Sequence, residues 1–167
     1  MSVAAPADHH GVPVRPAWPI WSDPPASRRP ARSIDDVLAE ARSRLVRLTV
    51  GQARRASTEH GAVLVDIRPA AQRAAEGELA EAVVIERNVL EWRFDPRHEA
   101  RLPIAAKADR DGLRVIVMCQ EGFTSSLAAD SLLRLGVRRA TDLAGGFAAW
   151  AEAGLPLTRL RMVPARA

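Results

Sequence analysis

Short apolar runs alternate with helical patterns over residues 62 to 153. Unbroken apolar runs of this length are typical of strands buried on both faces, as in a parallel sheet. Parallel neighbours need a crossover connection, which is usually a helix. We therefore expect an α/β domain in which helices cover both faces of a parallel sheet of about five strands. The strands that the runs predict are Ala62–Ile67, Ala82–Ile85, Val115–Met118 and Ala140–Leu143.

The helical stretches have recognisable ends. Ser33 followed by two aspartates is typical of a helix start, and apolar residues at near-helical spacing continue to Leu48. This pattern predicts an amphipathic helix that covers one side of the domain. We expect further helices over residues 51–59, 69–76, 124–135 and 147–153, and a long polar connection with one or two short helices over 86–112.

The chain of 167 residues is long enough for one domain but too short for two full ones. Residues 1–32 hold seven of the twelve prolines, which predicts a largely disordered tail, although its Trp18 and Trp21 could dock on the domain or a partner. The predicted organisation is this tail, a domain with an N-terminal helical extension over 33–158, and a basic C-terminal tail over 159–167.

The net charge of +4 does not predict a nucleic-acid partner. Four of the arginines lie in residues 1–32 and three in 159–167, whereas residues 33–158 carry 17 basic and 18 acidic side chains. A nearly neutral domain offers no basic face of the kind that binds phosphates.

Cys119 is the one cysteine of the chain, and it follows the apolar run Val115–Met118 directly. A helical pattern begins a few residues later, so the cysteine lies in a loop between a buried strand and a helix start. Backbone N–H groups and the positive end of the helix dipole point into such a loop and favour a thiolate. Free cysteines are often plain core residues, but a loop of glycine, hydroxyl and amide side chains is poor core material. Cys119 is therefore a candidate nucleophile.

One cysteine excludes an intrachain disulfide and a cysteine-rich zinc site, which fits a reducing compartment. No stretch reaches 18 apolar residues, and the first twenty residues lack an apolar signal-peptide core. We expect a cytoplasmic protein without a membrane partner. The four histidines, His9, His10, His60 and His98, have no metal-ligand spacing, so we expect no metal and no cofactor.

Three segments in order resemble the single-domain rhodanese family, over about residues 60–157. They are Val63-Leu64-Val65-Asp66-Ile67-Arg68, then Val115-Ile116-Val117-Met118-Cys119 with its six-residue loop, and Leu143-Ala144-Gly145-Gly146-Phe147-Ala148-Ala149-Trp150 with Ala153-Gly154-Leu155-Pro156 after it. The resemblance implies a rhodanese-like sheet in which Cys119 takes sulfane sulfur from a donor as a persulfide. It would pass that sulfur to a thiol or to cyanide.

The expected partners are a small-molecule sulfur donor and a thiol acceptor, or a protein persulfide as donor. We expect backbone N–H groups of the loop to hold the transferred sulfur, Gly122 to let the chain curl, and Thr124 or Ser125 to donate a hydroxyl or cap the helix. Asp66 and Arg68 end the neighbouring strand and should form an ion pair beside the loop. The candidate substrate-binding residues are Gln120, Glu121, Gly122, Phe123, Thr124, Ser125, Asp66 and Arg68, with Cys119 catalytic.

Two segments depart from the family pattern. Active members often carry a cation in the loop that attracts thiosulfate, whereas this loop has Glu121 and Phe123, so thiosulfate should be a poor donor. Arg87 or Arg93 could replace the missing cation, and Trp92 between them could be a core anchor. Residues 77–81 lack the histidine, the proline and the second glycine that the family commonly has here, which we interpret as a surface change.

Two alternatives remain open. Dual-specificity phosphatases and arsenate reductases can share this fold with a Cys-x5-Arg loop, but the arginine position here is Ser125. Without a guanidinium to bind phosphate, phosphatase chemistry is disfavoured. The other alternative is a non-catalytic binding or redox-sensing module that keeps the fold and uses the thiol as a sensor or not at all.

Overall fold

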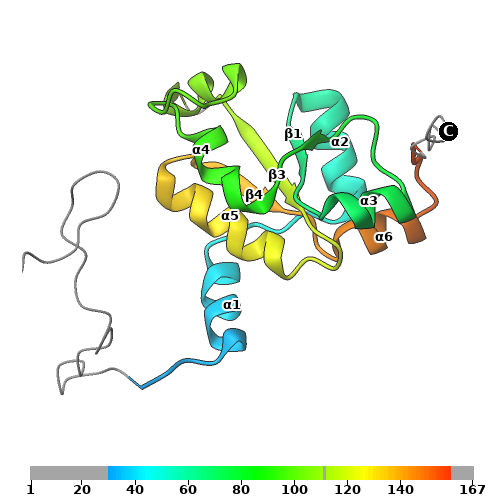
Figure 1. The fold of residues 1–167 in the computed structure, drawn as a ribbon, viewed down its shortest axis with the longest axis horizontal. Helices are drawn as coiled ribbons and strands as arrows, with labels where there is room; N and C mark the ends of the chain where they lie inside the picture. Colours follow the sequence, from blue (N-terminus) through cyan, green and yellow to red (C-terminus); the bar gives the residue numbers. More distant parts are fainter. Residues whose placement is uncertain (1–29, 111, 159–167) are drawn as a thin grey trace, which may run out of the picture. The chain divides into compact units, whose positions relative to one another are not determined.

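The computed structural model describes residues 30–110 and 112–158, and the expectations for the two tails, including Trp18 and Trp21, lie outside these residues. The chain alternates helices and strands as the apolar runs predict (Figure 1). In chain order the elements are α1 Ile34–Ser43, α2 Val50–His60, β1 Val63–Asp66, α3 Ala70–Glu76, β2 Val83–Val84, η1 Arg87–Val89, α4 Leu90–Phe94, η2 Pro103–Arg110, β3 Arg114–Met118, α5 Thr124–Leu135, β4 Arg139–Asp142 and α6 Gly146–Glu152.

The sheet is parallel throughout, with strand order β2-β1-β3-β4. The predicted α/β class is therefore confirmed, but the expectation of about five strands is wrong, since the described residues form four. A fifth position at the edge holds only a single parallel bridge between Leu48 and Leu143. The segment cannot extend into a strand because Thr49 already caps α2, with reciprocal hydrogen bonds between Thr49 and Gln52.

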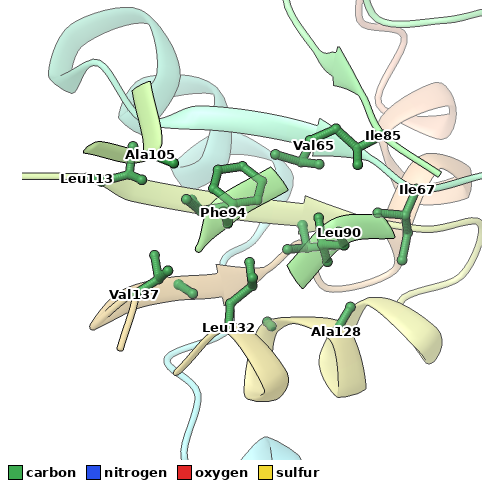
Figure 2. Close-up of a cluster of buried hydrophobic side chains, with 14 of the residues drawn as sticks. Val65, Ile67, Ile85, Leu90, Phe94, Ala105, Leu113, Ala128, Leu132 and Val137 are labelled. Carbon is green, nitrogen blue, oxygen red and sulfur yellow. The ribbon is translucent and has the colours of Figure 1, made fainter. Parts of the chain in front are cut away.

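Two apolar clusters lie on opposite faces of the sheet. Along β3, Val115 and Val117 belong to one cluster, and Ile116 and Met118 belong to the other, as the two-residue period of a strand requires. Figure 2 shows the first cluster, where α4 and α5 cover the sheet with Leu90, Phe94, Ala128 and Leu132. The second cluster is covered by α2 and α6 with Ala53, Phe147 and Trp150. Because β1, β3 and β4 pair in parallel, their carboxyl ends lie at one edge of the sheet.

The N-terminal extension differs from the single long helix that the pattern predicts. Helix α1 ends at Ser43, and the chain then continues without regular secondary structure to the bridge at Leu48. The spacing misleads because only Leu38 and Ala41 are buried within the helix, while Leu45 packs on the first core cluster from the segment after the helix. The extension contacts α5, and Figure 1 shows α1 beside that helix.

Asp130 of α5 joins the two elements. Arg44 donates two hydrogen bonds to its carboxylate, at 2.5 and 2.9 Å, and Arg134 donates a third from the next turn of α5 at 3.0 Å. These hydrogen bonds, with that from Arg44 the largest cause, hold the pKa of Asp130 below its ordinary value of 3.8 although partial burial acts in the opposite direction.

Asp130 should therefore stabilise the fold in a pH-dependent way. A lowered folded-state pKa means that the stabilisation is present above about pH 5 and is lost as the pH falls through 3.8 and below. In urea unfolding, Asp130→Asn should be less stable than the wild type at pH 7, and the difference should shrink toward pH 3. The exposed Glu99→Gln is the control and should give no such trend. An Asp130→Asn deficit that is constant with pH would contradict the ion-pair explanation.

Candidate functional site

Cys119 lies at the carboxyl end of β3 and is nearly buried, with 9% of its surface exposed. Its Sγ accepts backbone hydrogen bonds from Gly122 at 3.2 Å and from Ser125 at 3.3 Å, and the Ser125 Oγ lies 3.3 Å away. Two N–H donors aimed at one sulfur stabilise negative charge on it. The loop therefore presents two backbone donors to the Cys119 sulfur.

Gly122 and Gly146 make the tight loop possible. Gly122 has a φ of 80°, and a Cβ there would lie 2.9 Å from the Gly145 nitrogen and 3.1 Å from the Leu143 oxygen. Gly146, at a φ of 59°, passes so close to the carbonyls of Cys119 and Gln120 that a Cβ would overlap them. This approach lets the N–H groups of Phe147 and Ala148 bond to those same carbonyls, at 2.9 and 3.0 Å. These two hydrogen bonds thus join the glycine turn before α6 to the start of the cysteine loop.

The hydroxyls of the loop do not cap α5. Its N-cap is Phe123, and no side chain caps the helix. The expectation that Thr124 or Ser125 caps it is therefore wrong. Ser125 is fully buried and lies between Cys119 and Asp142, whereas Thr124 is exposed at the rim of a pocket.

This pocket opens over Cys119 and has a volume of about 300 Å³. Most of the loop residues singled out from the sequence line it, whereas Gly122, Ser125 and Asp66 do not. Of the lining residues, Glu121 is exposed and Phe123 has 53% of its surface exposed. The lining residues are Ile67, Arg68, Pro69, Gln72, Arg87, Cys119, Gln120, Glu121, Phe123 and Thr124.

Asp66 and Arg68 form a fully buried ion pair beside this pocket. Arg68 donates to both carboxylate oxygens of Asp66 and, at 2.8 Å, to the carbonyl of Gly77. Its guanidinium lies 3.5 Å from the centre of the Phe147 ring. The pair therefore fixes the turn after β1, and Arg68 forms part of the pocket wall.

The segment at 77–81 is more than a surface change, contrary to our interpretation of its sequence. The Gly77 carbonyl holds Arg68, Leu79 is only 2% exposed, and Glu78 pairs with Thr158 in an antiparallel bridge. The segment keeps an apolar anchor and a carbonyl acceptor although it lacks the common family residues.

Of the two arginines proposed to replace the loop cation, Arg87 lines the pocket and Arg93 does not. Arg87 donates twice to Glu91, both at 2.9 Å. Burial acts to raise the pKa of Glu91, but hydrogen bonds from Ser131, its own backbone and Arg87 together lower it, so Glu91 is ionised and balances the charge of Arg87. Arg93 donates to the Ala100 carbonyl.

Trp92 is not a core anchor. It is 52% exposed and lines a separate hollow with Val89 and Arg93, while Leu90 and Phe94 on the same short helix are fully buried.

Within the described residues, no three metal-ligating side chains come together. No helix among them is long and apolar enough to span a bilayer.

The sequence reasoning missed a polar cluster behind the loop. Asp142 at the end of β4 is fully buried and accepts hydrogen bonds from Ser125 at 3.2 Å, Ser126 at 2.7 Å and, twice, Arg47. Asp142 could have been found, since it lies near the carboxyl end of the last predicted strand, at the same sheet edge as Asp66. Arg47 and Arg42, which also reach the loop, are 75 and 80 residues from Gly122 and carry no local signal.

Comparisons with known proteins agree with this architecture. A sulfurtransferase of Allochromatium vinosum is 34% identical over 95 residues, which cover 57% of this chain and 77% of that protein. A solved protein of unknown function from Rhodopseudomonas palustris, described as a possible tyrosine phosphatase, is 28% identical and has a TM-score of 0.68, covering 78% of this chain and 97% of its own. A human single-domain sulfurtransferase shares the fold at 23% identity and a TM-score of 0.52, covering 64% and 95%.

The family model described as "Rhodanese-like domain" matches residues 49–153, which is more than half of the chain. The match spans the sheet, the Cys119 loop and the glycine turn before α6. It confirms the resemblance that the three sequence segments indicate. The chain therefore belongs to the family of rhodanese-like domains.

Proposed function

We propose that this protein is a sulfurtransferase that carries sulfane sulfur as a persulfide on Cys119. The observation that carries the proposal is the pair of backbone N–H groups, from Gly122 and Ser125, that point at the Cys119 Sγ at the floor of an open pocket. Family membership and the relationship to a sulfurtransferase support the activity. A lone thiol that must cycle through a thiolate suits a reducing compartment such as the cytoplasm.

The reaction begins when the Cys119 thiolate attacks the terminal sulfur of a persulfide, R–S–SH. A bond forms between Sγ and that sulfur while the donor's S–S bond breaks, and the electron pair leaves with RS⁻. The proton of the transferred sulfur passes to solvent, so Cys119 becomes a persulfide anion. An acceptor thiolate or cyanide then attacks the outer sulfur, and the electron pair of the breaking bond returns to Sγ. The cycle needs no external oxidant or reductant.

The charges around the pocket favour a persulfide donor over thiosulfate. Arg68 is engaged with Asp66, and Arg87 is paired with ionised Glu91. Glu121 adds a negative charge at the rim. A dianion such as thiosulfate gains little attraction here, whereas a larger donor that carries an ammonium group, such as glutathione persulfide, can interact with Glu121 through that group. A protein persulfide is a second possible donor.

Charge reversal at Glu121 should therefore change the donor preference. We expect Glu121→Arg to load sulfur from thiosulfate about tenfold faster than the wild type, because a cation at the rim attracts the dianion. Glu121→Gln, which only removes the charge, should give a smaller gain. The measurement is sulfite release in a single turnover at low ionic strength. Equal rates in all three proteins would show that rim charge does not decide the donor.

The alternative activities predict different outcomes. The Rhodopseudomonas relative is described as a possible tyrosine phosphatase, but in this chain the expected arginine position is Ser125, whose hydroxyl faces Cys119 and Asp142. Steady-state assays with glutathione persulfide and thiosulfate as donors, and cyanide or a thiol as acceptor, test the proposal. Turnover supports a sulfurtransferase. Phosphatase turnover, or no turnover with either donor while Cys119 is alkylated readily, would overturn it.

A further inference from the structure

The carbonyl oxygen of Gly122 accepts hydrogen bonds from two arginines. Arg42 Nη2 and Arg47 Nη2 each donate to it at 2.9 Å. The Ser126 Oγ, whose proton goes to Asp142 at 2.7 Å, lies 3.1 Å from the same carbonyl. The N–H of this same residue points at the Cys119 Sγ. The two arginines therefore hold the residue that presents a hydrogen-bond donor to the sulfur.

Arg47 is placed by the backbone bridge at the sheet edge. The Leu48 N–H donates to the Asp142 carbonyl at 3.0 Å, and the Ala144 N–H donates to the Leu48 carbonyl at 2.9 Å. This bridge sets Arg47 against Asp142, whose carboxylate it binds through Nε at 2.9 Å and Nη2 at 3.0 Å. The same Nη2 also reaches Gly122.

Arg42 reaches the loop from the last turn of α1. Besides Gly122 it contacts the Ser126 Oγ through Nε at 3.2 Å, and its guanidinium lies over the Phe123 ring at 5.4 Å. Helix α1 is docked independently through Arg44 and Asp130. Arg42 is thus held in place by the docking of α1, which does not involve the loop that Arg42 supports.

Both arginines precede residue 49, where the match to the rhodanese-like domain begins. We infer that the extension over residues 34–48 is a working part of the sulfur-transfer site, in which Arg42 and Arg47 are positioning residues that hold the loop in its sulfur-binding conformation. The inference rests on the proposed function, because it assumes that Cys119 transfers sulfur. The effect of Arg42 and Arg47 on the reactivity of Cys119 can be measured without that assumption.

Arg47 has a second role through Asp142. A buried carboxylate next to Ser125 disfavours a thiolate nearby and competes for the hydroxyl proton of Ser125. Because Arg47 neutralises Asp142 and Ser126 also donates to it, the Ser125 hydroxyl can turn toward a charged Sγ. Removal of the guanidinium should therefore both loosen Gly122 and expose Sγ to the charge of Asp142.

The test compares Arg47→Met, Arg47→Lys and Arg42→Met with wild type in the rate of Cys119 alkylation by iodoacetamide from pH 6 to 10. For Arg47→Met we expect a rate about tenfold lower at pH 7, a loss equal to one charge-assisted hydrogen bond. The deficit should narrow toward pH 10, where the thiol ionises in every variant. Arg47→Lys should recover part of the rate because it keeps the charge beside Asp142, and Arg42→Met should show a smaller deficit.

Arg55→Met is the matched control, since Arg55 is an exposed arginine of α2 that lies outside the extension and the loop. It should leave alkylation at the wild-type rate. Wild-type alkylation in Arg47→Met, or a deficit that is equal at every pH, would overturn the inference. Failure of the wild type to transfer sulfur would instead refute the proposed function, and the alkylation profiles would still report on loop positioning.

Discussion

Cys119→Ser should lose sulfur transfer by at least about a thousandfold, from any donor, while the protein remains folded. The reaction needs a nucleophile that can accept a sulfur atom and release it again, and a serine oxygen cannot form that exchangeable bond. The serine hydroxyl can still accept hydrogen bonds from the backbone N–H groups of Gly122 and Ser125, so we expect the loop to keep its conformation. The measurement is transfer from glutathione persulfide to cyanide, followed as thiocyanate.

Urea unfolding of the same variant provides the control, and its free energy should lie within about 1.5 kcal/mol of wild type for a near-isosteric change. Ser125→Ala is the companion variant, because it removes a hydroxyl beside Sγ but keeps the backbone donor. It should slow transfer without abolishing it. Transfer by folded Cys119→Ser within tenfold of wild type would refute the assignment of Cys119 as nucleophile.

Arg68→Met should destabilise the fold by about 3–5 kcal/mol, which is the usual cost of removing one partner of a buried ion pair. Asp66 is fully buried and would be left without its cation, and the Gly77 carbonyl would lose its donor. The methionine fills much of the space that the Arg68 side chain leaves. The loss of stability therefore reflects the missing charge more than a cavity. The measurement is the free energy of urea unfolding at pH 7.

Arg97→Met is the matched control, because Arg97 is 85% exposed and lies 4.0 Å from Asp95. Its effect should be below about 1 kcal/mol. The double variant Asp66→Asn/Arg68→Met should recover part of the loss, since it removes the uncompensated charge. A loss below about 1 kcal/mol for Arg68→Met, or no recovery in the double variant, would show that the pair does not hold the turn after β1.

The sequence was sufficient to predict the parallel α/β fold and the position of Cys119. Both depend on local signals, namely unbroken apolar runs separated by helical patterns and a cysteine directly after such a run. The carboxyl ends of parallel strands meet at one edge, which is why Asp66 could be placed beside the loop from sequence alone. The ion pair between Asp66 and Arg68 is local in the same sense, two residues apart.

Features that depend on distant partners could not be predicted. Arg42 and Arg47 meet Gly122 only because the extension packs on α5 and bridges to the end of β4. Apolar spacing through Leu48 indicated one helix, but a single bridge to Leu143 holds that residue instead. Trp92 was a reasonable candidate for a core anchor because it is a large aromatic residue. Leu90 and Phe94 of the same helix are buried in the core instead, and Trp92 is exposed.

The most direct test of the central claim is the intact mass of the reduced protein after incubation with glutathione persulfide and removal of excess donor. The persulfide account predicts a gain of one sulfur atom, which cyanide or a thiol discharges and which Cys119→Ser does not acquire. No added sulfur in a protein whose Cys119 is alkylated readily would contradict the account, and the domain would then be a binding or redox-sensing module.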